Sequence, residues 1–459
     1  MASPSEENSP LLNQSHGRKH YGQIKKKTMA VRLATALAIL AIMVVGVWGL
    51  QHFITQRQQP PRRTKPDFSS LKGFCDGVSP IQPKEYLERQ ARLAQVLEQE
   101  NAAALIVEPG PTMLYYTNIA WSLSERPFLV VLQRNGSSID TTVVTPMFEA
   151  TRAYEAIKDA QLPAKAQPIV TEWIEHESPY MLVSKVVQGE GTVFVEPNVR
   201  LFVYDGIAES LGRERTHMAS RALQTLRMIK SPAELDILRC VNRATEAAIR
   251  AVRPHVQAGM TEEDIANVME AALHTAGLTN TWVLALVDEN AAFPHGEPGK
   301  EKRVTDKSTV LIDTGGELLG YQSDTTRTFF VDGKGHNSTI VEAWHVVKKA
   351  QESVLELAKA GTSCANVDLI ARNVIDDAGY GKYFTHRLGH GIGEEMHEEP
   401  YMNRGNTQLE LKPGMTFSVE PGIYITHEFG IRLEDIVVVN EQGHLETLTT
   451  GLTDNPWTL

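Results

Sequence analysis

The chain has 459 residues, 42% of them hydrophobic and 22% charged, which is the composition of a folded protein of two or three domains and excludes a disordered or collagen-like chain. The net charge of -11 divides unevenly, because residues 1–65 hold 10 basic and 2 acidic residues, a charge of +8, and the rest hold 35 basic and 54 acidic, a charge of -19. Residues 66–459 are therefore strongly acidic and show no basic stripe with interleaved aromatic residues. This argues against nucleic-acid binding.

An uncharged apolar run over residues 33–50 predicts a transmembrane helix over 29–50. At 1.5 Å per residue it spans about 27 Å, close to the hydrocarbon thickness of a bilayer. The alternatives are a buried core helix and a cleaved signal peptide, although the run is long for a signal peptide and no small-residue cleavage site follows it. Six basic residues precede the run and four follow it before residue 66, which predicts a cytosolic basic tail over 1–28 and a lumenal body, hence a type II membrane protein.

The tail also carries a candidate sorting signal. Glu7 followed by Leu11 and Leu12 resembles an acidic dileucine signal, which predicts a sorting adaptor as partner and a vacuolar, lysosomal or other endomembrane location. Glycosylation sequons at Asn135 and Asn337 would be lumenal in this topology, although an N-cap is the alternative for Asn337. The remaining sequon, at Asn13, would be cytosolic, so a glycan there would overturn the orientation.

Three cysteines are present, Cys75, Cys240 and Cys364. Their number and spacing make neither a disulfide framework nor a paired metal motif. At most one bridge could form, and we expect none.

After a proline-rich and basic linker over 51–75, residues 76–224 predict an α/β domain. Residues 83–102 have helical apolar spacing, and the runs at 104–109, 128–133 and 192–197 are typical of buried strands, the last followed by a helix at 201–212.

Residues 225–459 predict a second domain made of two similar α/β halves. Ser231 and Glu234 form a capping box that opens a helix to about residue 256, and Thr261 opens another that ends at Gly277. Strands are predicted at 281–287 and 309–315. Two helices between Asn337 and residue 379, then strands at 415–421 and 431–439, repeat that order.

The second domain contains side chains of the kinds that bind metals. Asp313 and Asp324 lie eleven residues apart in a glycine-containing hairpin pattern that would bring both carboxylates together. Turn capping is the alternative, but an aspartate inside the apolar strand around Asp313 needs a partner or a metal.

Histidines and glutamates extend this set. His386, His390 and His397 are each, taken alone, most often structural, whereas Glu420 and Glu434 lie in apolar β sequence where a glutamate is costly unless it is coordinated. Four carboxylates and one imidazole on a sheet can hold two divalent ions.

In this order and spacing the residues resemble the pita-bread metallopeptidases, which include aminopeptidase P, prolidase and methionine aminopeptidase. The resemblance covers about 76–459 and is strongest over 225–440. It implies an N-terminal creatinase/prolidase-type domain, 76–224, and a pita-bread catalytic domain, 225–459, with pseudo-twofold halves, in a fold of the α/β (α+β) class.

The resemblance also implies a ligand set. Asp313 would chelate one metal ion, Asp324 and Glu434 would bridge two, and His390 and Glu420 would bind the second. Manganese fits this oxygen-rich set best, with cobalt or zinc as alternatives.

The same resemblance implies roles in substrate binding and catalysis. His397 would polarise the scissile carbonyl, His295 would be contributed by the loop ahead of the first ligand strand, and His386 would lie near a proline pocket. Arg432 would contact the substrate or order the acidic cluster. Packing or support of the ligands is the alternative for these four residues.

The activity implied is hydrolysis of Xaa-Pro bonds in small peptides by a membrane-anchored exopeptidase, possible as a homodimer. A hydroxide bridging the ions would attack the carbonyl, and Glu420 would shuttle its proton to the proline nitrogen.

Several alternatives stay open. Aminopeptidase P and prolidase are not separated by these motifs, whereas methionine aminopeptidase lacks the N-terminal domain. A non-peptide hydrolase or a lyase on the same metal-bound scaffold remains, as does an inactive membrane-tethered binding module. The filled ligand positions argue against creatinase-like amidohydrolases and histone chaperones.

Overall fold

The computed structural model describes residues 35, 38–48, 66–331, 335–452 and 454–458. The chain divides into two compact units, residues 1–65 and 66–459. In the first unit, residues 38–48 are helical. Within the described ranges no helix is both long and apolar enough to cross a bilayer. Much of the span predicted over 29–50 lies outside these ranges, as do Glu7, Leu11, Leu12 and Asn13.

The second unit begins with a mixed six-stranded sheet in the order β4-β3-β2-β1-β5-β6. Its strands are β1 (Ala102–Val107), β2 (Leu129–Asn135), β3 (Ser138–Pro146), β4 (Ile169–Trp173), β5 (Thr192–Val195) and β6 (Thr216–Met218). The β1–β2 and β2–β3 pairs are antiparallel, and the β3–β4, β1–β5 and β5–β6 pairs are parallel. This agrees with the predicted α/β domain.

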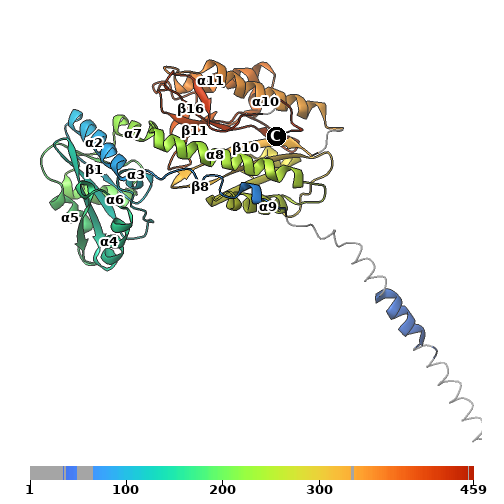
Figure 1. Cartoon of the computed structure of the whole chain (residues 1–459), viewed down its shortest axis with the longest axis horizontal. Helices are drawn as coiled ribbons and strands as arrows, with labels where there is room; N and C mark the ends of the chain where they lie inside the picture. The colour runs from blue at the N-terminus through green and yellow to red at the C-terminus, as the bar shows by residue number, and fades with distance from the viewer. Residues whose placement is uncertain (1–34, 36–37, 49–65, 332–334, 453, 459) are drawn as a thin grey trace, which may run out of the picture. The chain divides into compact units, whose positions relative to one another are not determined.

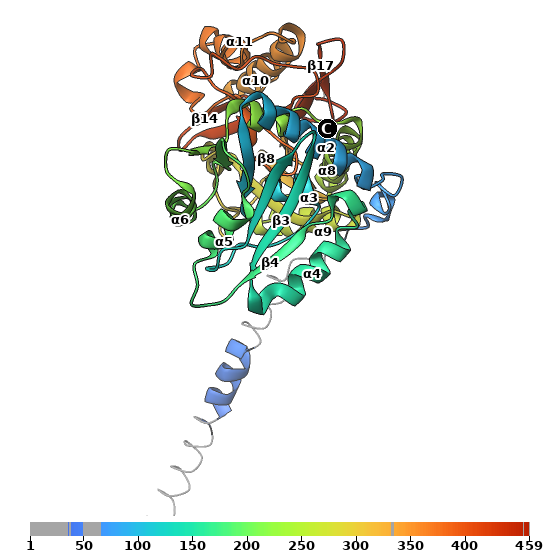
Figure 2. The same ribbon diagram turned by 90° about the vertical axis from the view of Figure 1, so that its left-hand side faces the viewer.

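Helices cover both faces of this sheet. They are α2 (Pro83–Gln99), α3 (Pro111–Thr117), α4 (Ala150–Asp159), α5 (Pro179–Val186), α6 (Leu201–Leu211) and α7 (Arg221–Met228). Because side chains alternate along a strand, Leu105 and Val107 of β1 pack in one core with α2, whereas Ala104 and Ile106 pack in another with α5 and α6. In Figure 2, α4 lies along β4 at the edge of the sheet.

The next part of the chain places two helices against a smaller antiparallel sheet. Helices α8 (Pro232–Val252) and α9 (Glu262–Thr275) both open with the capping boxes that the sequence predicts, at Ser231 and Thr261. The strands are β7 (Thr279–Val287), β8 (Thr309–Leu318), β9 (Tyr321–Gln322) and β10 (Thr325–Phe330), in the order β10-β8-β7 with β9 on β8. One apolar core joins α8 and α9 to this sheet.

The last part repeats this composition, as predicted. Helices α10 (Ser338–Leu357) and α11 (Cys364–Asp377) are labelled in Figure 1 beside the strands β11 and β16. A sheet in the order β12-β11-β13-β16-β17 is made of β11 (Gly389–Gly391), β12 (Glu398–Met402), β13 (Thr416–Val419), β16 (Asp435–Val439) and β17 (Leu445–Thr447). Strands β14 (Gly422–Ile425) and β15 (Phe429–Arg432) form a separate hairpin.

Two strand predictions in this part were wrong in detail. The strand predicted over 431–439 is two strands, because β15 ends at Arg432 and β16 begins at Asp435. Glu420, expected within a strand, follows the end of β13 at Val419. Both glutamates are therefore at breaks between strands, where the chain turns from one sheet into the β14–β15 hairpin or back.

The prediction that no disulfide forms was also wrong. Cys75 and Cys240 are bonded, at a sequence separation of 165 positions and with 6.0 Å between their Cα atoms. Phe68 and Leu71, beside the short 3-10 helix η1 (Ser69–Leu71), are buried in the core of α8 and α9, which brings Cys75 to α8. Part of the segment predicted to be a linker is therefore folded, and a long-range contact of this kind leaves no signal in the spacing of cysteines.

Candidate functional site

Five side chains predicted to bind metals come from five separate places in the two small sheets. Asp313 lies in β8, which pairs antiparallel with β10. Asp324 lies between β9 and β10, and His390 is the central residue of β11. Glu420 follows β13, and Glu434 stands in the break between β15 and β16. The hairpin predicted between the two aspartates is present.

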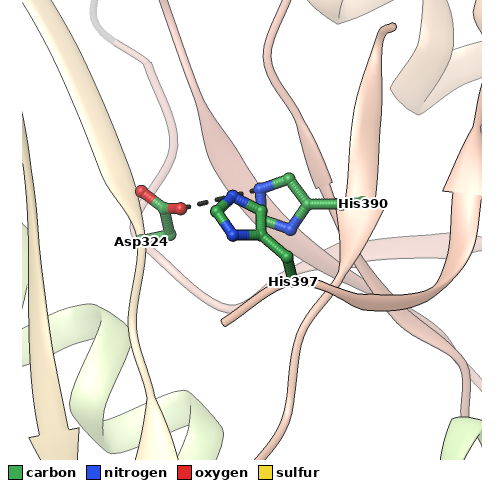
Figure 3. Close-up of side chains that lie close together, drawn as sticks. All are labelled: Asp324, His390 and His397. Atoms are coloured by element: carbon green, nitrogen blue, oxygen red, sulfur yellow. Dashed lines mark ion pairs between the residues drawn. The ribbon is translucent and has the colours of Figure 1, made fainter. Parts of the chain in front are cut away.

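The structure brings these five side chains together. Potential ligand atoms lie within 4.8 Å of one another in three overlapping groups: Asp324 with His390 and His397, His390 with Glu420 and Glu434, and Asp313 with Asp324 and Glu434. Figure 3 shows the first group, in which Nε2 of His390 lies 3.6 Å from a carboxylate oxygen of Asp324. The rings of His390 and His397 have centroids 4.2 Å apart. We call the five predicted ligands the carboxylate cluster.

Three oxygens of the carboxylate cluster are buried without a hydrogen-bond partner. They are Oδ1 of Asp313, Oδ1 of Asp324 and Oε1 of Glu434. Leaving such an atom unpaired costs about 1–3 kcal/mol, and more when the group is charged. Carboxylate oxygens with one imidazole nitrogen are ligands that hard or borderline divalent ions accept. The cluster therefore fits divalent cations by both its unpaired oxygens and its donor set.

Burial and mutual repulsion make these carboxylates hold protons in the absence of a cation. Burial raises the pKa of Asp324 well above its usual value, and the neighbouring Glu434 and Asp313 raise it further. The pKa of Glu434 rises for the same reasons, burial first and then Glu420 and Asp313. Burial raises the pKa of Glu420 to about 7, although Arg432 opposes this shift. A bound cation would relieve this repulsion.

Arg432 supplies the one guanidinium that contacts the cluster directly among the described residues. It forms an ion pair with Asp313, and its Nε donates to Thr326 Oγ1 at 3.0 Å. One terminal nitrogen also donates to the hydroxyl of Tyr424 at 3.0 Å. With its donors used in this way, Arg432 orders the cluster and partly balances its charge.

Three further histidines predicted to take part lie around the cluster at different depths. Burial lowers the pKa of His386 to about 3, so the ring is neutral, and its Nε2 lies 2.9 Å from the Tyr424 hydroxyl. His397 is exposed, and burial of part of its ring together with Arg387 lowers its pKa. His295 is exposed and belongs to none of the three groups, but its charge contributes to the lowered pKa values of His386 and His397.

Sequence reasoning missed the hydroxyl groups that orient the ligands. Thr326 Oγ1 donates to Glu434 Oε2 at 2.7 Å. Ser418 Oγ donates to Glu420 Oε1 at 3.1 Å and accepts from the backbone N–H of His390 at 3.0 Å. Two-residue alternation in β13 could have pointed to Ser418, because it stands two residues before Glu420.

A second missed feature is Arg89 of α2, which is fully buried and reaches both loops that carry the site. Its guanidinium donates to the hydroxyl of Tyr321 at 3.0 Å and to Glu394 at 3.4 Å. Tyr321 stands three residues before Asp324, and Glu394 stands between His390 and His397 in sequence. Through Arg89, the first domain is thus hydrogen-bonded to the two loops that carry Asp324 and His390.

Comparisons with known proteins agree with this arrangement. Residues 236–441 match the family described as Metallopeptidase family M24, and residues 89–229 match the Creatinase/Prolidase N-terminal domain. An uncharacterized peptidase of Schizosaccharomyces pombe is 39% identical over 79% of this chain and 81% of its own. The probable dipeptidase PepE of Mycobacterium tuberculosis is 34% identical over 78% of this chain and 93% of its own.

Solved structures show the same fold. A dipeptidase PepE from Mycobacterium ulcerans superposes with a TM-score of 0.75 at 30% identity, covering 83% of this chain and 99% of that one. A prolidase from Thermococcus sibiricus gives a TM-score of 0.70 at 27% identity, covering 81% and 99%. The resemblance therefore extends over both domains.

The raised carboxyl pKa values predict that protons compete with metal ions. The usual pKa of a glutamate is 4.5, and the pKa of Glu420 is about 7. Between pH 5 and 7 Glu420 therefore still holds a proton that a metal ion must displace, and manganese affinity should rise roughly tenfold per pH unit for each proton displaced. A carboxyl group whose pKa is higher in the folded than in the unfolded protein stabilises the fold at a pH below its unfolded pKa, and this stabilisation is lost as the pH rises to the folded pKa. The melting temperature of the metal-free protein should therefore fall between pH 5 and 7. Titration calorimetry and melting curves measure both, and a manganese affinity independent of pH would contradict this account.

Proposed function

The chain belongs to metallopeptidase family M24, and from that premise we propose that it is a dinuclear metal-dependent exopeptidase that hydrolyses Xaa-Pro bonds. The observation that carries the proposal is the carboxylate cluster, in which three buried acids, the half-buried Glu420 and one imidazole meet with three oxygens unpaired. A cluster with so much uncompensated negative charge is expensive for a fold to keep unless it binds cations.

Two ions can be shared among five residues of this kind. We assign Asp313 to one ion, His390 and Glu420 to the other, and Asp324 and Glu434 to both, because each of the last two belongs to two of the overlapping groups and has two oxygens to share. His390 also belongs to two groups, but its Nδ1 lies 3.1 Å from the carbonyl oxygen of Gly391, so one nitrogen is left for one ion. Manganese is the proposed metal because oxygen ligands dominate. When bound, such ions polarise a carbonyl oxygen and lower the pKa of a water molecule.

The surrounding side chains supply proton transfer and positioning. Glu420 accepts a proton from the attacking water and delivers it to the proline nitrogen, which carries no hydrogen in the peptide and must gain one as it leaves. His397, at the exposed rim of the cluster, donates a hydrogen bond to the scissile carbonyl oxygen as negative charge develops there. We assign His295, whose charge acts on both His386 and His397, to contact with the substrate backbone.

The proline side of the scissile bond is assigned to His386, Tyr424 and Arg432. His386 is neutral and hydrogen-bonded to Tyr424, and Tyr424 is held by Arg432, so the three form a fixed wall. A fixed wall suits a rigid ring better than a flexible side chain. The names of the relatives, probable dipeptidase and prolidase, also support a proline-directed dipeptidase, with an Xaa-Pro aminopeptidase as the alternative.

We expect the segment from residue 66 onward, with manganese added, to hydrolyse Ala-Pro or Ala-Pro-Ala. Glu420→Gln should lower kcat by at least about a hundredfold, because the proton shuttle is lost. The exposed Glu441→Gln is the matched control and should retain full activity. Liquid chromatography of released proline-containing product measures each rate.

The outcomes separate the alternatives. Turnover of the dipeptide alone identifies a prolidase, and turnover of the tripeptide identifies an aminopeptidase. Full activity in Glu420→Gln would contradict the mechanism. If neither peptide is cleaved although two ions are bound, a non-peptide hydrolase or lyase replaces the proposal, and failure to bind metal at all favours an inactive binding module.

We also propose that residues 29–50 anchor the chain as a type II membrane protein with the catalytic domain in the lumen of a vacuole or lysosome. The uncharged run and the +8 charge of the first 65 residues support it. The Cys75–Cys240 bridge is of a kind that persists in oxidising compartments. Asn135 and Asn337 are exposed and accessible to glycosylation, although Asn337 also N-caps α10. The homodimer and the sorting adaptor stay predictions.

Expression of the full chain in yeast tests this topology. Wild-type protein should stay with membranes after alkaline extraction and lose mass on endoglycosidase treatment, because the catalytic domain is lumenal. Asn135→Gln combined with Asn337→Gln should abolish that loss, and Asn13→Gln should not change it. A glycan on Asn13, or release of the protein by alkali, would rule the topology out.

A further inference from the structure

A cavity of about 340 Å³ is lined by His397, whose ring centroid lies 4.2 Å from that of His390, and by none of the five residues of the carboxylate cluster. His397 forms one wall, and Glu196, which follows β5 of the first domain, forms another. His386, Tyr424 and Arg432, assigned to the proline side, do not line it. The cavity is therefore placed to receive the substrate residue on the other side of the scissile bond.

The charges in the cavity do not balance. Four carboxylates line it, Glu196, Glu395, Glu398 and Glu399, but only one cation does, Arg227. Arg227 pairs with Glu398 at 2.6 Å and lies 3.6 Å from Glu395. From outside the lining, Lys230 pairs with Glu398, and Arg221 pairs with Glu399 at 3.0 Å. Three cations thus serve four carboxylates, which leaves one negative charge.

Glu196 is the carboxylate left over. Among the described residues, no lysine or arginine lies within ion-pair distance of it, and its neutral partner is the hydroxyl of Thr112. That hydroxyl already accepts from Arg227 at 2.9 Å. Burial raises the pKa of Glu196; the Thr112 hydroxyl and Arg227, which lies beyond ion-pair distance, lower it, and the neighbouring Glu395 raises it. A cation placed beside Glu196 would complete the ion-pair network of the cavity.

The rest of the lining is suited to an aliphatic stem. Leu105, Leu223, Met228 and the ring of Tyr116 supply apolar surface to the same cavity. A lysine or arginine side chain has this form, with methylene groups that pack on apolar surface and a cationic head that pairs with a carboxylate.

We propose that this cavity is the specificity pocket for the residue before proline, and that Glu196 selects a basic side chain there. The inference rests on the proposed Xaa-Pro activity and makes Lys-Pro and Arg-Pro peptides the preferred substrates. An unpaired Glu196 also disfavours an acidic side chain in the same pocket, because the two like charges repel each other.

The test compares kcat/KM for Arg-Pro, Lys-Pro, Met-Pro and Glu-Pro with the manganese-loaded protein. Methionine matches the length of the lysine stem without its charge. Wild type should favour Lys-Pro over Met-Pro by about tenfold or more, and Glu196→Gln should reduce that ratio by a similar factor, since one charge-assisted contact is lost. Glu190→Gln, at an exposed site just before β5, is the control and should keep the wild-type ratio.

Equilibrium binding separates the failure of the pocket from the failure of the activity. Calorimetry with L-argininamide and L-methioninamide needs no turnover and no variant, and tighter binding of L-argininamide to the wild type supports the pocket even if no Xaa-Pro peptide is cleaved. Equal binding of the two amides, or a Lys-Pro to Met-Pro ratio that is the same in wild type and Glu196→Gln, would overturn the proposal.

Discussion

Repulsion among four closely placed carboxylates, three buried and one half-buried, is the constraint on which the rest of this structure depends. Burial raises the pKa values of Asp324, Glu420 and Glu434, and the neighbouring carboxylates, Asp313 among them, raise these values further. Within the described residues Arg432 is the only permanent cation that forms an ion pair with any of these carboxylates, and it pairs with one of them. The fold must therefore hold these carboxylates together against their mutual repulsion. Such an arrangement serves a purpose only if the carboxylates bind cations.

Two features of the chain maintain this arrangement. The strand breaks after Val419 and after Arg432 let a glutamate leave the sheet and point to the cluster, while the flanking apolar strands stay in the core. Behind the cluster, Arg89 joins the first domain to the loops that carry Asp324 and His390, through Tyr321 and Glu394. The same domain supplies Glu196 to the cavity beside His397. The first domain thus contributes both support and a wall of the substrate site.

Much of this could be predicted because the signals are local. The capping boxes at Ser231 and Thr261 lie within four residues, and the ligand motifs each lie within one strand or hairpin. What failed depends on contacts between distant segments. Three features depend on residues from different elements: the Cys75–Cys240 bridge, the burial of Arg89 and the unpaired charge of Glu196. Nothing in the neighbouring sequence distinguishes these residues from other cysteines, arginines and glutamates. The strand break at Glu434 was missed because apolar β sequence lies on both sides of it, whereas Pro421 and Gly422, directly after Glu420, are a turn signal that the strand prediction passed over.

The central claim is that the carboxylate cluster is a site for two divalent ions. The most direct measurement is the metal content of the purified protein, by mass spectrometry, after loading with manganese and removal of free ions. The account predicts two ions per chain in the wild type and in the exposed control Asp306→Asn, and fewer than two in Asp324→Asn, whose carboxylate is assigned to both ions. A wild-type protein that retains no ion, or an Asp324→Asn variant that still retains two, would contradict it.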